Sequence, residues 1–158
     1  MSFVMSPCIN LSIEIENMIR KYREKDIESV LHVWLKTSIK AHNFIPAEFW
    51  ESELESMRNV YVPASELYVY ELDSSVVGFY ALKDNELAAI FLLPECQGHG
   101  IGKQLLSHAR EQREELTLTV YKENKASYDF YLSQGFRVVN EEVGEKTGHL
   151  QYIMISGA

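Results

Sequence analysis

The chain contains 158 residues, 46% of them hydrophobic and 11% aromatic, which is enough apolar material for one packed core without disulfides or metals to reinforce it. The net charge of −8 at pH 7 and the isoelectric point near 5.1 argue against nucleic acids and anionic membranes as partners. No apolar run reaches the length of about 18 residues that spans a bilayer, and the N-terminus lacks the pattern of a signal peptide, so we expect a soluble protein.

The two cysteines, Cys8 and Cys96, are too few for a disulfide framework and fit no metal-ligand spacing. No pair among the five histidines has metal-ligand spacing either. We therefore expect reduced thiols, no metal site and a cytoplasmic location.

Residues 18–158 are expected to form a single domain, because no linker, repeat or low-complexity tract divides them. Residues 1–17 precede the first regular pattern, and we expect them to be an extension that comes from an upstream start codon or from cloning. An ordered segment packed on the domain or on a second subunit is the alternative.

The first part of this domain contains one strand pattern and two helix patterns. A strand is expected at Ile19–Tyr22, followed by a helix that Asp26 caps. Pro46 begins a second helix, which runs to about Val60. The apolar faces of the two helices consist of Ile27, Val30, Leu31, Trp34, Leu35 and Ile39 in the first, and of Trp50, Leu54, Met57 and Tyr61 in the second.

Three strands follow, with connections short enough for hairpins. Strands at 67–72 and 76–82 flank the turn 73–75, and a strand at 86–93 follows the turn 83–85. The first strands of the sheet are therefore expected to be antiparallel.

A crossover then changes the strand direction. A helix at 102–114 leads to a strand at 116–121, which should lie parallel to the strand before it. Asn124 caps the last helix, Gly135 closes it, and strands at 136–142 and 149–155 complete the chain. These elements predict an α/β fold with a mixed, mostly antiparallel sheet of about seven strands, flanked by about four helices.

The most informative segment is Gln97-Gly98-His99-Gly100-Ile101-Gly102, which lies between the apolar stretch 87–93 and the helix at 102–114. Glycines let the backbone approach an anion closely, and the N–H groups at a helix N-terminus attract negative charge. This order of strand, glycine loop and helix predicts a phosphate cradle.

The spacing of the loop excludes two familiar nucleotide motifs. A dinucleotide fingerprint needs a third glycine where this chain has Lys103. A P-loop needs glycine at position 97 and Ser or Thr at position 104, and both positions hold glutamine. The spacing of Gln97, Gly100 and Gly102 instead matches the pattern Q/R-x-x-G-x-G/A.

A second motif lies downstream, in the segment from Asn124 to Phe136. It is similar to the pattern N-x-x-A-x-x-F-Y-x-x-x-G-F, with Ser127 at the position of the small residue. Two motifs in this order and at this separation support each other. The chain from about Ile19 to Ile155 resembles the GNAT superfamily of N-acetyltransferases, whose fold we expect here.

The resemblance implies that acetyl-CoA is the co-substrate. The N–H groups of the loop would hold its pyrophosphate, and the backbone of the strand at 90–93 would pair with the pantetheine arm. In this family that strand carries a bulge, and a backbone N–H near Leu92 would polarise the thioester carbonyl. The expected coenzyme A contacts are Ile90, Leu92, Leu93, Gln97, Gly98, His99, Gly100, Ile101, Gly102, Lys103, Asn124, Ser127 and Tyr131.

The same resemblance gives Tyr131 the role of general acid that protonates the departing thiolate. By its spacing alone, a tyrosine on this helix would be a core residue. Asn124 is similarly ambiguous, because helix capping explains it fully and its contact with coenzyme A rests on the resemblance.

The amine acceptor must lose its proton before it attacks. Glu86 lies eleven residues before Gln97, a spacing at which some protein acetyltransferases of this superfamily place their base. Other members place a glutamate twelve residues before the tyrosine, where this chain has Thr119. A water chain without a dedicated base is the alternative, and a glutamate after a turn is commonly just a solvated strand end.

Acceptor contacts are expected from the connection between the first two helices and from the last hairpin. The pattern His42-Asn43-Phe44-Ile45 resembles a subgroup of small bacterial GNAT proteins that includes lysine acetyltransferases. The expected acceptor residues are Trp34, His42, Phe44 and His149, although a lone histidine or aromatic residue beside an apolar helix more commonly serves packing.

The sequence thus predicts acetyl transfer from acetyl-CoA to a primary amine by direct attack in a ternary complex. A lysine side chain or a peptide N-terminus is the favoured acceptor, and a polyamine, amino acid or aminoglycoside-like amine is the alternative. A non-catalytic acyl-CoA sensor is the alternative of another class. Since many relatives dimerise, a homodimer is compatible with the resemblance.

Overall fold

A computed structural model describes residues 18–157. Seven strands form one sheet in the order β1-β2-β3-β4-β5-β7-β6. All neighbours are antiparallel except β4 and β5, which are parallel. The strands are β1 (Ile19–Lys21), β2 (Glu66–Leu72), β3 (Ser75–Lys83), β4 (Glu86–Leu92), β5 (Thr117–Tyr121), β6 (Phe136–Val143) and β7 (Leu150–Ser156).

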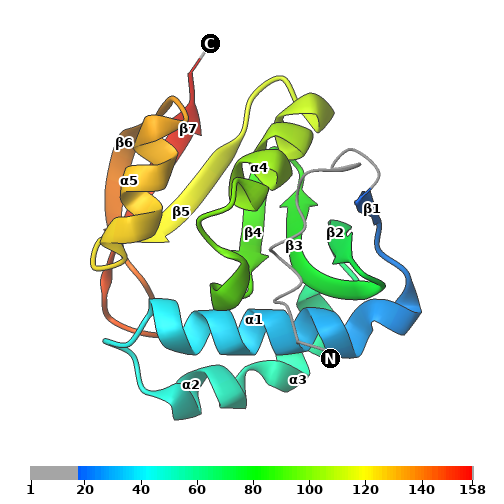
Figure 1. The fold of residues 1–158 in the computed structure, drawn as a ribbon. Coiled ribbons are helices and arrows are strands. Elements are labelled where there is room, and N and C mark those ends of the chain that lie inside the picture. The colour runs from blue at the N-terminus through cyan, green and yellow to red at the C-terminus, as the bar shows by residue number, and fades with distance from the viewer. Residues whose placement is uncertain (1–17, 158) are drawn as a thin grey trace.

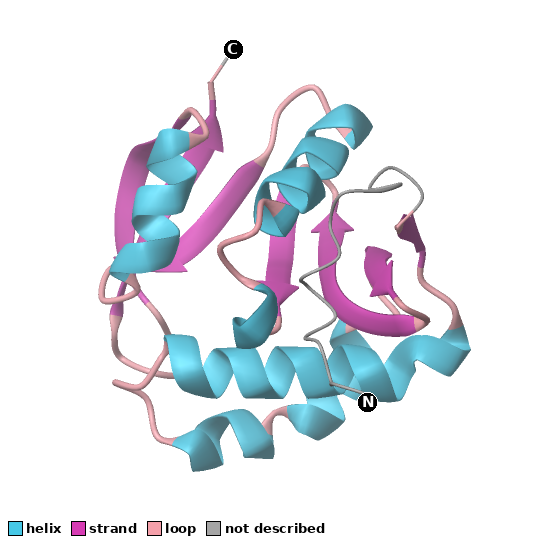
Figure 2. Ribbon diagram, in the orientation of Figure 1, coloured by secondary structure: helices cyan, strands magenta, loops and turns pink. Residues whose placement is uncertain are grey.

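The helices cover the sheet, as Figures 1 and 2 show. The predicted mixed sheet of seven strands and its flanking helices are confirmed. The helices are α1 (Ile27–Ala41), α2 (Ala47–Ser52), α3 (Leu54–Ser56), α4 (Ile101–Gln112) and α5 (Lys125–Ser133), and short helical turns occur at Glu24–Asp26 (η2), Met57–Tyr61 (η3) and Pro94–Cys96 (η4).

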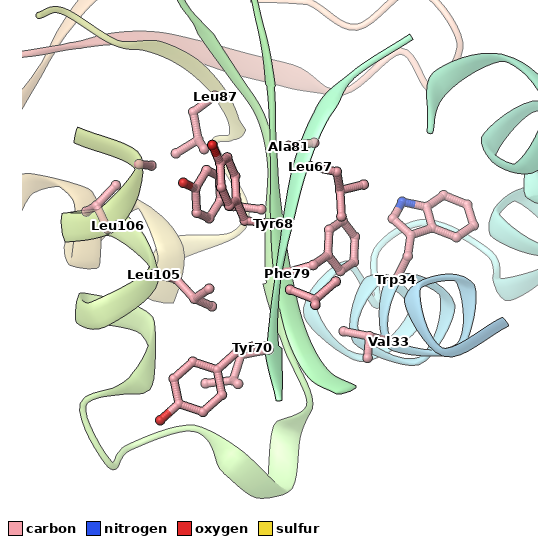
Figure 3. Packing of buried hydrophobic residues seen from close by; sticks show 14 of the residues in the cluster. Val33, Trp34, Leu67, Tyr68, Tyr70, Phe79, Ala81, Leu87, Leu105 and Leu106 are labelled. Carbon is pink, nitrogen blue, oxygen red and sulfur yellow. The ribbon is translucent and has the colours of Figure 1, made fainter. Parts of the chain in front are cut away.

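The core consists of two layers of side chains, one on each face of the sheet. Figure 3 shows Leu105 and Leu106 of α4 on one side of the strands and Val33 and Trp34 of α1 on the other. Alternate residues of a strand point to opposite faces. Tyr68 and Tyr70 of β2 accordingly face α4, and Leu67 faces α1 together with Phe79 of β3.

Asp26 holds the predicted N-cap position of α1, but its side chain makes no hydrogen bond that caps the helix. Its carboxylate instead accepts bonds from both terminal nitrogens of Arg20, at 2.8 and 3.0 Å, and from the backbone N–H of Arg23 at 2.8 Å. The planar guanidinium offers a paired geometry that a single backbone N–H cannot match.

The second predicted helix is not continuous. It begins after Pro46 as expected, but it breaks at Glu53 and ends in the π-helical turn η3. In this turn the N–H of Val62 donates to the carbonyl of Met57 at 3.0 Å, a span of five residues. The wide turn leaves Val60 and Tyr61 exposed while Val62 is buried.

Candidate active site

The parallel strands β4 and β5 are paired only at one end. Glu86 is the residue of β4 in register with Thr117, whose N–H donates to the carbonyl of Asn85 at 2.9 Å. Beyond this point the strands diverge (Figure 1). Ala81 of β3 pairs with Ala89 and Leu82 pairs with Leu87, so Ala88 is the extra residue of a bulge in β4. The bulge that the resemblance implied is present.

The backbone of β4 beyond this bulge has hydrogen-bonding groups that face the gap. The N–H of Leu93 donates to Val77 on β3. Because backbone groups alternate in direction along a strand, the N–H groups of Leu92 and Ile90 are directed away from β3 and toward the diverging β5. The side chains of Thr37 and Gln97 donate hydrogen bonds to the carbonyl of Leu92 at 3.2 and 2.9 Å. These two bonds anchor this end of the strand.

The glycine loop follows directly. Gly98 and Gly100 have φ values of +84° and +87°, which non-glycine residues rarely adopt. A Cβ added at either residue would meet no atom within 4 Å, so the backbone is open on that side. Gly100 is the residue before α4, and the unpaired N–H groups of the first helical turn lie at this opening.

A cavity of about 770 Å³, which we call the glycine-loop cavity, lies between α1, β4, α4 and α5. Among the residues predicted to bind coenzyme A, Leu93, His99 and Ile101 do not line it, and both Leu93 and Ile101 are buried in the core. The predicted residues that line it are Ile90, Leu92, Gln97, Gly98, Gly100, Gly102, Lys103, Asn124, Ser127 and Tyr131.

The charge of this cavity is opposite to that of the chain as a whole. Among the described residues of its lining, Lys40, Lys103 and Lys125 are basic, and Glu123 has the one carboxylate. Lys125 is also paired with Asp129 one helical turn later, at 2.9 Å. In a chain of net charge −8, this local excess of positive charge suits an anionic ligand.

A second cavity of about 520 Å³, which we call the aromatic cavity, lies across the gap between β4 and β5. Its walls come from the helical segments α1, α2, η3 and α5 and from the strands β2, β3, β4, β5 and β7. The two cavities meet, because they share the lining residues Ile90, Phe91, Asn124, Ser127 and Tyr131.

Tyr131 lies at this meeting point and is only 8% exposed. Burial raises the pKa of its phenol above the usual value, so the hydroxyl stays protonated at neutral pH. No hydrogen bond joins this hydroxyl to another side chain or to the backbone within residues 18–157. Tyr131 therefore has a proton to donate, and none of the described residues competes for it.

Asn124 joins the two sides of the site. Its side-chain oxygen accepts from the N–H of Ser127 at 3.3 Å and so caps α5, as the sequence predicts. Its amide nitrogen lies 3.2 Å from Nε2 of His42. That contact makes Nε2 the acceptor, so the imidazole is neutral, and burial lowers the pKa of His42 to about 4.

The predicted acceptor residues form one aromatic group but do not share one surface. Trp34 and His42 line the aromatic cavity, whereas Phe44 and His149 line neither cavity. Phe44 packs on His42 and His149 with ring centroids 5.8 and 5.1 Å apart. His149 also binds Glu123 at 2.8 Å through Nδ1. Phe44 and His149 therefore lie behind His42 and do not face the cavity themselves.

Glu86 is exposed and lines the aromatic cavity at the paired end of β4, and Thr119 lines the same cavity from β5. Among the described residues of this lining, Glu86 has the sole carboxylate. Glu86 is therefore the acidic group that a ligand in the aromatic cavity can reach.

Two groups of lining residues were not predicted from the sequence. The first is the polar and basic rim that α1 and α5 add to the glycine-loop cavity, including Thr37, Lys40 and Lys125. The second is η3, whose residues Val60 and Tyr61 line the aromatic cavity. Exposed lysines give no periodic pattern in a sequence, and a π-helical turn depends on tertiary packing. Neither group of lining residues could therefore be predicted from the sequence.

The expectation of reduced cysteines is contradicted for Cys96, which is fully buried and disulfide-bonded. Spacing in the sequence gives no information about which segments approach this side chain in space. Cys8 and the extension 1–17 lie outside the described residues.

Within residues 18–157, no helix is both long and apolar enough to cross a membrane. In the same residues, no group of three or more His, Cys, Asp or Glu side chains is arranged to hold a metal ion.

Comparison with known proteins gives consistent matches. Residues 20–154 match the family model of the acetyltransferase (GNAT) domain. The chain is 32% identical to the peptidyl-lysine N-acetyltransferase YiaC of Escherichia coli over 124 residues, which cover 78% of this chain and 85% of YiaC. It is 30% identical to a spermidine N(1)-acetyltransferase of Thermoplasma acidophilum, and the matched residues cover 81% of this chain and 90% of that enzyme.

Two solved structures have the same fold. The apo form of YjaB from E. coli aligns with a TM-score of 0.79 and 27% identity, covering 89% of this chain and 97% of YjaB. The PaiA N-acetyltransferase of T. acidophilum was solved in complex with coenzyme A. It aligns with a TM-score of 0.74 and 27% identity, covering 89% of this chain and 98% of PaiA. The basic glycine-loop cavity and the opened β4–β5 edge fit such a ligand, and the chain belongs to the GNAT family of acetyl-CoA-dependent N-acetyltransferases.

Proposed function

We propose that this enzyme acetylates the side-chain amine of lysine in a peptide or protein, with a peptide N-terminus as the closest alternative acceptor. The observation that carries the proposal is the meeting of the two cavities at Tyr131, Ile90 and Phe91. An anionic thioester donor and an amine that enters from the opposite side would meet there without a covalent enzyme intermediate. The names of the E. coli relatives YiaC and YjaB support lysine as the acceptor.

The glycine-loop cavity holds acetyl-CoA in this proposal. The N–H groups of the loop and of the first turn of α4 bind the pyrophosphate, and Lys103 and Lys125 add positive charge. The pantetheine arm pairs with the free edge of β4. The N–H of Leu92, which is directed into the gap, is the donor for the oxygen of the thioester carbonyl.

Tyr131 assists the departure of the thiolate. A thiol has a pKa of about 8.5, which is lower than the raised pKa of the buried phenol. Tyr131 therefore stabilises the thiolate chiefly by donating a hydrogen bond as the carbon–sulfur bond breaks.

Glu86 removes the proton from the incoming ammonium. This role is supported by the position of Glu86, whose carboxylate lines the aromatic cavity. Glu86→Gln should lower kcat/KM at neutral pH, and the defect should shrink as the pH approaches the amine pKa of about 10.4, because the acceptor then loses its proton without help. An unchanged pH profile would assign deprotonation to water instead.

The direct test measures free thiol released from acetyl-CoA with lysine peptides, peptides with a free N-terminus, and small amines, against an amine-free control. Mass spectrometry of the peptide then locates the acetyl group. We expect turnover on lysine side chains. Coenzyme A binding without turnover on any amine would favour the acyl-CoA sensor instead.

A cytoplasmic location belongs to the same proposal, because acetyl-CoA is an intracellular metabolite.

A further inference from the structure

The aromatic cavity has almost no charge on its walls. Lys83 and Glu86 are the ionic side chains among the described residues that line it, and their formal charges cancel. His42 adds none at neutral pH, because burial lowers its pKa to about 4. The carboxylates of Glu53 and Glu123 beside the cavity are already bonded to Lys146 and His149.

This distribution of charge disfavours a polycationic acceptor. Spermidine carries several ammonium groups, and each group that enters an apolar cavity without a partner loses several kcal/mol of hydration. Glu86 can compensate one ammonium. The cavity therefore suits an acceptor with a single positive charge.

The walls are apolar and leave more room than one amine needs. Trp34, Trp50, Leu67 and Phe79 line the cavity, and each is less than a tenth exposed. The volume of about 520 Å³ lies within the range that encloses a drug-sized ligand. The four methylenes and ammonium of a lysine side chain occupy only part of this space, so a neighbouring apolar group of the acceptor can enter as well.

The outer wall is apolar but open to solvent. Val60 and Tyr61 of η3 are 57% and 48% exposed, and both line the cavity. We call these two residues the η3 ledge. Nζ of Lys146 lies 5.9 Å from the centre of the Tyr61 ring while it is bonded to Glu53 at 2.7 Å. Lys146, in the hairpin between β6 and β7, thereby contacts the ring of the ledge, and the carboxylate of Glu53 is already in an ion pair with it.

Large apolar side chains that stay exposed at the rim of a binding cavity indicate contact with a partner. The ledge is continuous with the acceptor site, so its occupant is attached to the reacting amine. We propose that the preferred acceptor is a lysine flanked by a bulky apolar residue, which docks on the η3 ledge, and that polyamines are poor acceptors. This inference rests on the proposed function and specifies its substrate.

The test uses the full-length enzyme with acetyl-CoA and short peptides whose N-termini are blocked, so that lysine is their sole amine. We expect kcat/KM to be about tenfold higher for Ac-Leu-Lys-Gly-amide or Ac-Gly-Lys-Leu-amide than for Ac-Gly-Lys-Gly-amide. Spermidine should have a lower kcat/KM than any of these peptides. Val60→Ser should remove most of the difference in kcat/KM between the leucine peptides and the glycine peptide.

Val139→Ser is the matched control, because Val139 is 48% exposed on the edge strand β6 and lines neither cavity. It should leave all three peptides unaffected. Coenzyme A affinity, measured by calorimetry, verifies that both variants are folded.

The outcomes separate the two proposals. If no peptide and no polyamine raises thiol release, the amine acetyltransfer itself is refuted, and the ledge inference fails with it. If glycine- and leucine-flanked lysines react equally well, or if spermidine is the better acceptor, acetyl transfer stands and the ledge inference is wrong.

Discussion

Replacement of Tyr131 by phenylalanine removes one hydroxyl from the meeting point of the two cavities. The ring remains, with its packing on Phe130 and Phe136 at 5.6 and 5.8 Å between centroids. Since the hydroxyl has no hydrogen-bond partner within residues 18–157, its loss should change the free energy of unfolding by less than about 0.5 kcal/mol.

The effect on catalysis should be far larger than the effect on stability. Loss of one donor to a charge that develops in a buried site costs about 3–4 kcal/mol, which is about 10²–10³ in kcat. The affinity for coenzyme A should change less than about threefold, because the pyrophosphate and pantetheine contacts do not involve this hydroxyl. Steady-state thiol release gives kcat, and calorimetry gives the affinity.

Tyr128→Phe provides the control on the same helix. Tyr128 packs on Tyr152 with centroids 4.9 Å apart and lines neither cavity, so its variant should retain full kcat. A kcat for Tyr131→Phe within twofold of the wild-type value would refute the role of Tyr131. An equal loss in both variants would assign the effect to the helix rather than to the hydroxyl.

Three further predictions concern the loop, the buried histidine and the ion pair near the N-terminal end of α1. Gly100→Val places a β-branched residue at φ +87° and fills the open side of the loop, so coenzyme A affinity measured by calorimetry should fall more than tenfold. Because burial lowers the pKa of His42 from 6.5 to about 4, the unfolded chain binds the proton more readily, and stability should fall as the pH drops from about 6.5 to about 4, by up to about 3 kcal/mol. In His42→Gln, the pH dependence of Tm in that window should be shallower, and an identical slope would contradict the assignment. Asp26→Asn should cost about 1.5–3 kcal/mol in urea unfolding, because it removes one of the two carboxylate partners of Arg20 and leaves only Glu71 among the described residues, while an intact midpoint would show that the pair is not stabilising.

The order of the elements could be read from the sequence because it depends on neighbouring residues. Short apolar runs between turn residues located the strands, and the cap at Asn124 forms as predicted. The interruption of the second helix at Glu53 and the pairing of Asp26 with Arg20 could not be read, because both depend on segments that fold onto each other.

The sequence by itself determined the family, the succession of seven strands along the chain and the residues of the loop and of α5, because both motifs are local and encode backbone conformations and helix termini. The tertiary structure alone decided that β4 and β5 separate after one pair, that two cavities meet at Tyr131, and that His42 is buried and neutral. It also decided that lysines from α1 and α5 surround one cavity and that the η3 ledge borders the other. A cavity exists where segments distant in the chain fail to fill the space between them, and burial shifts a pKa only after the whole domain has packed.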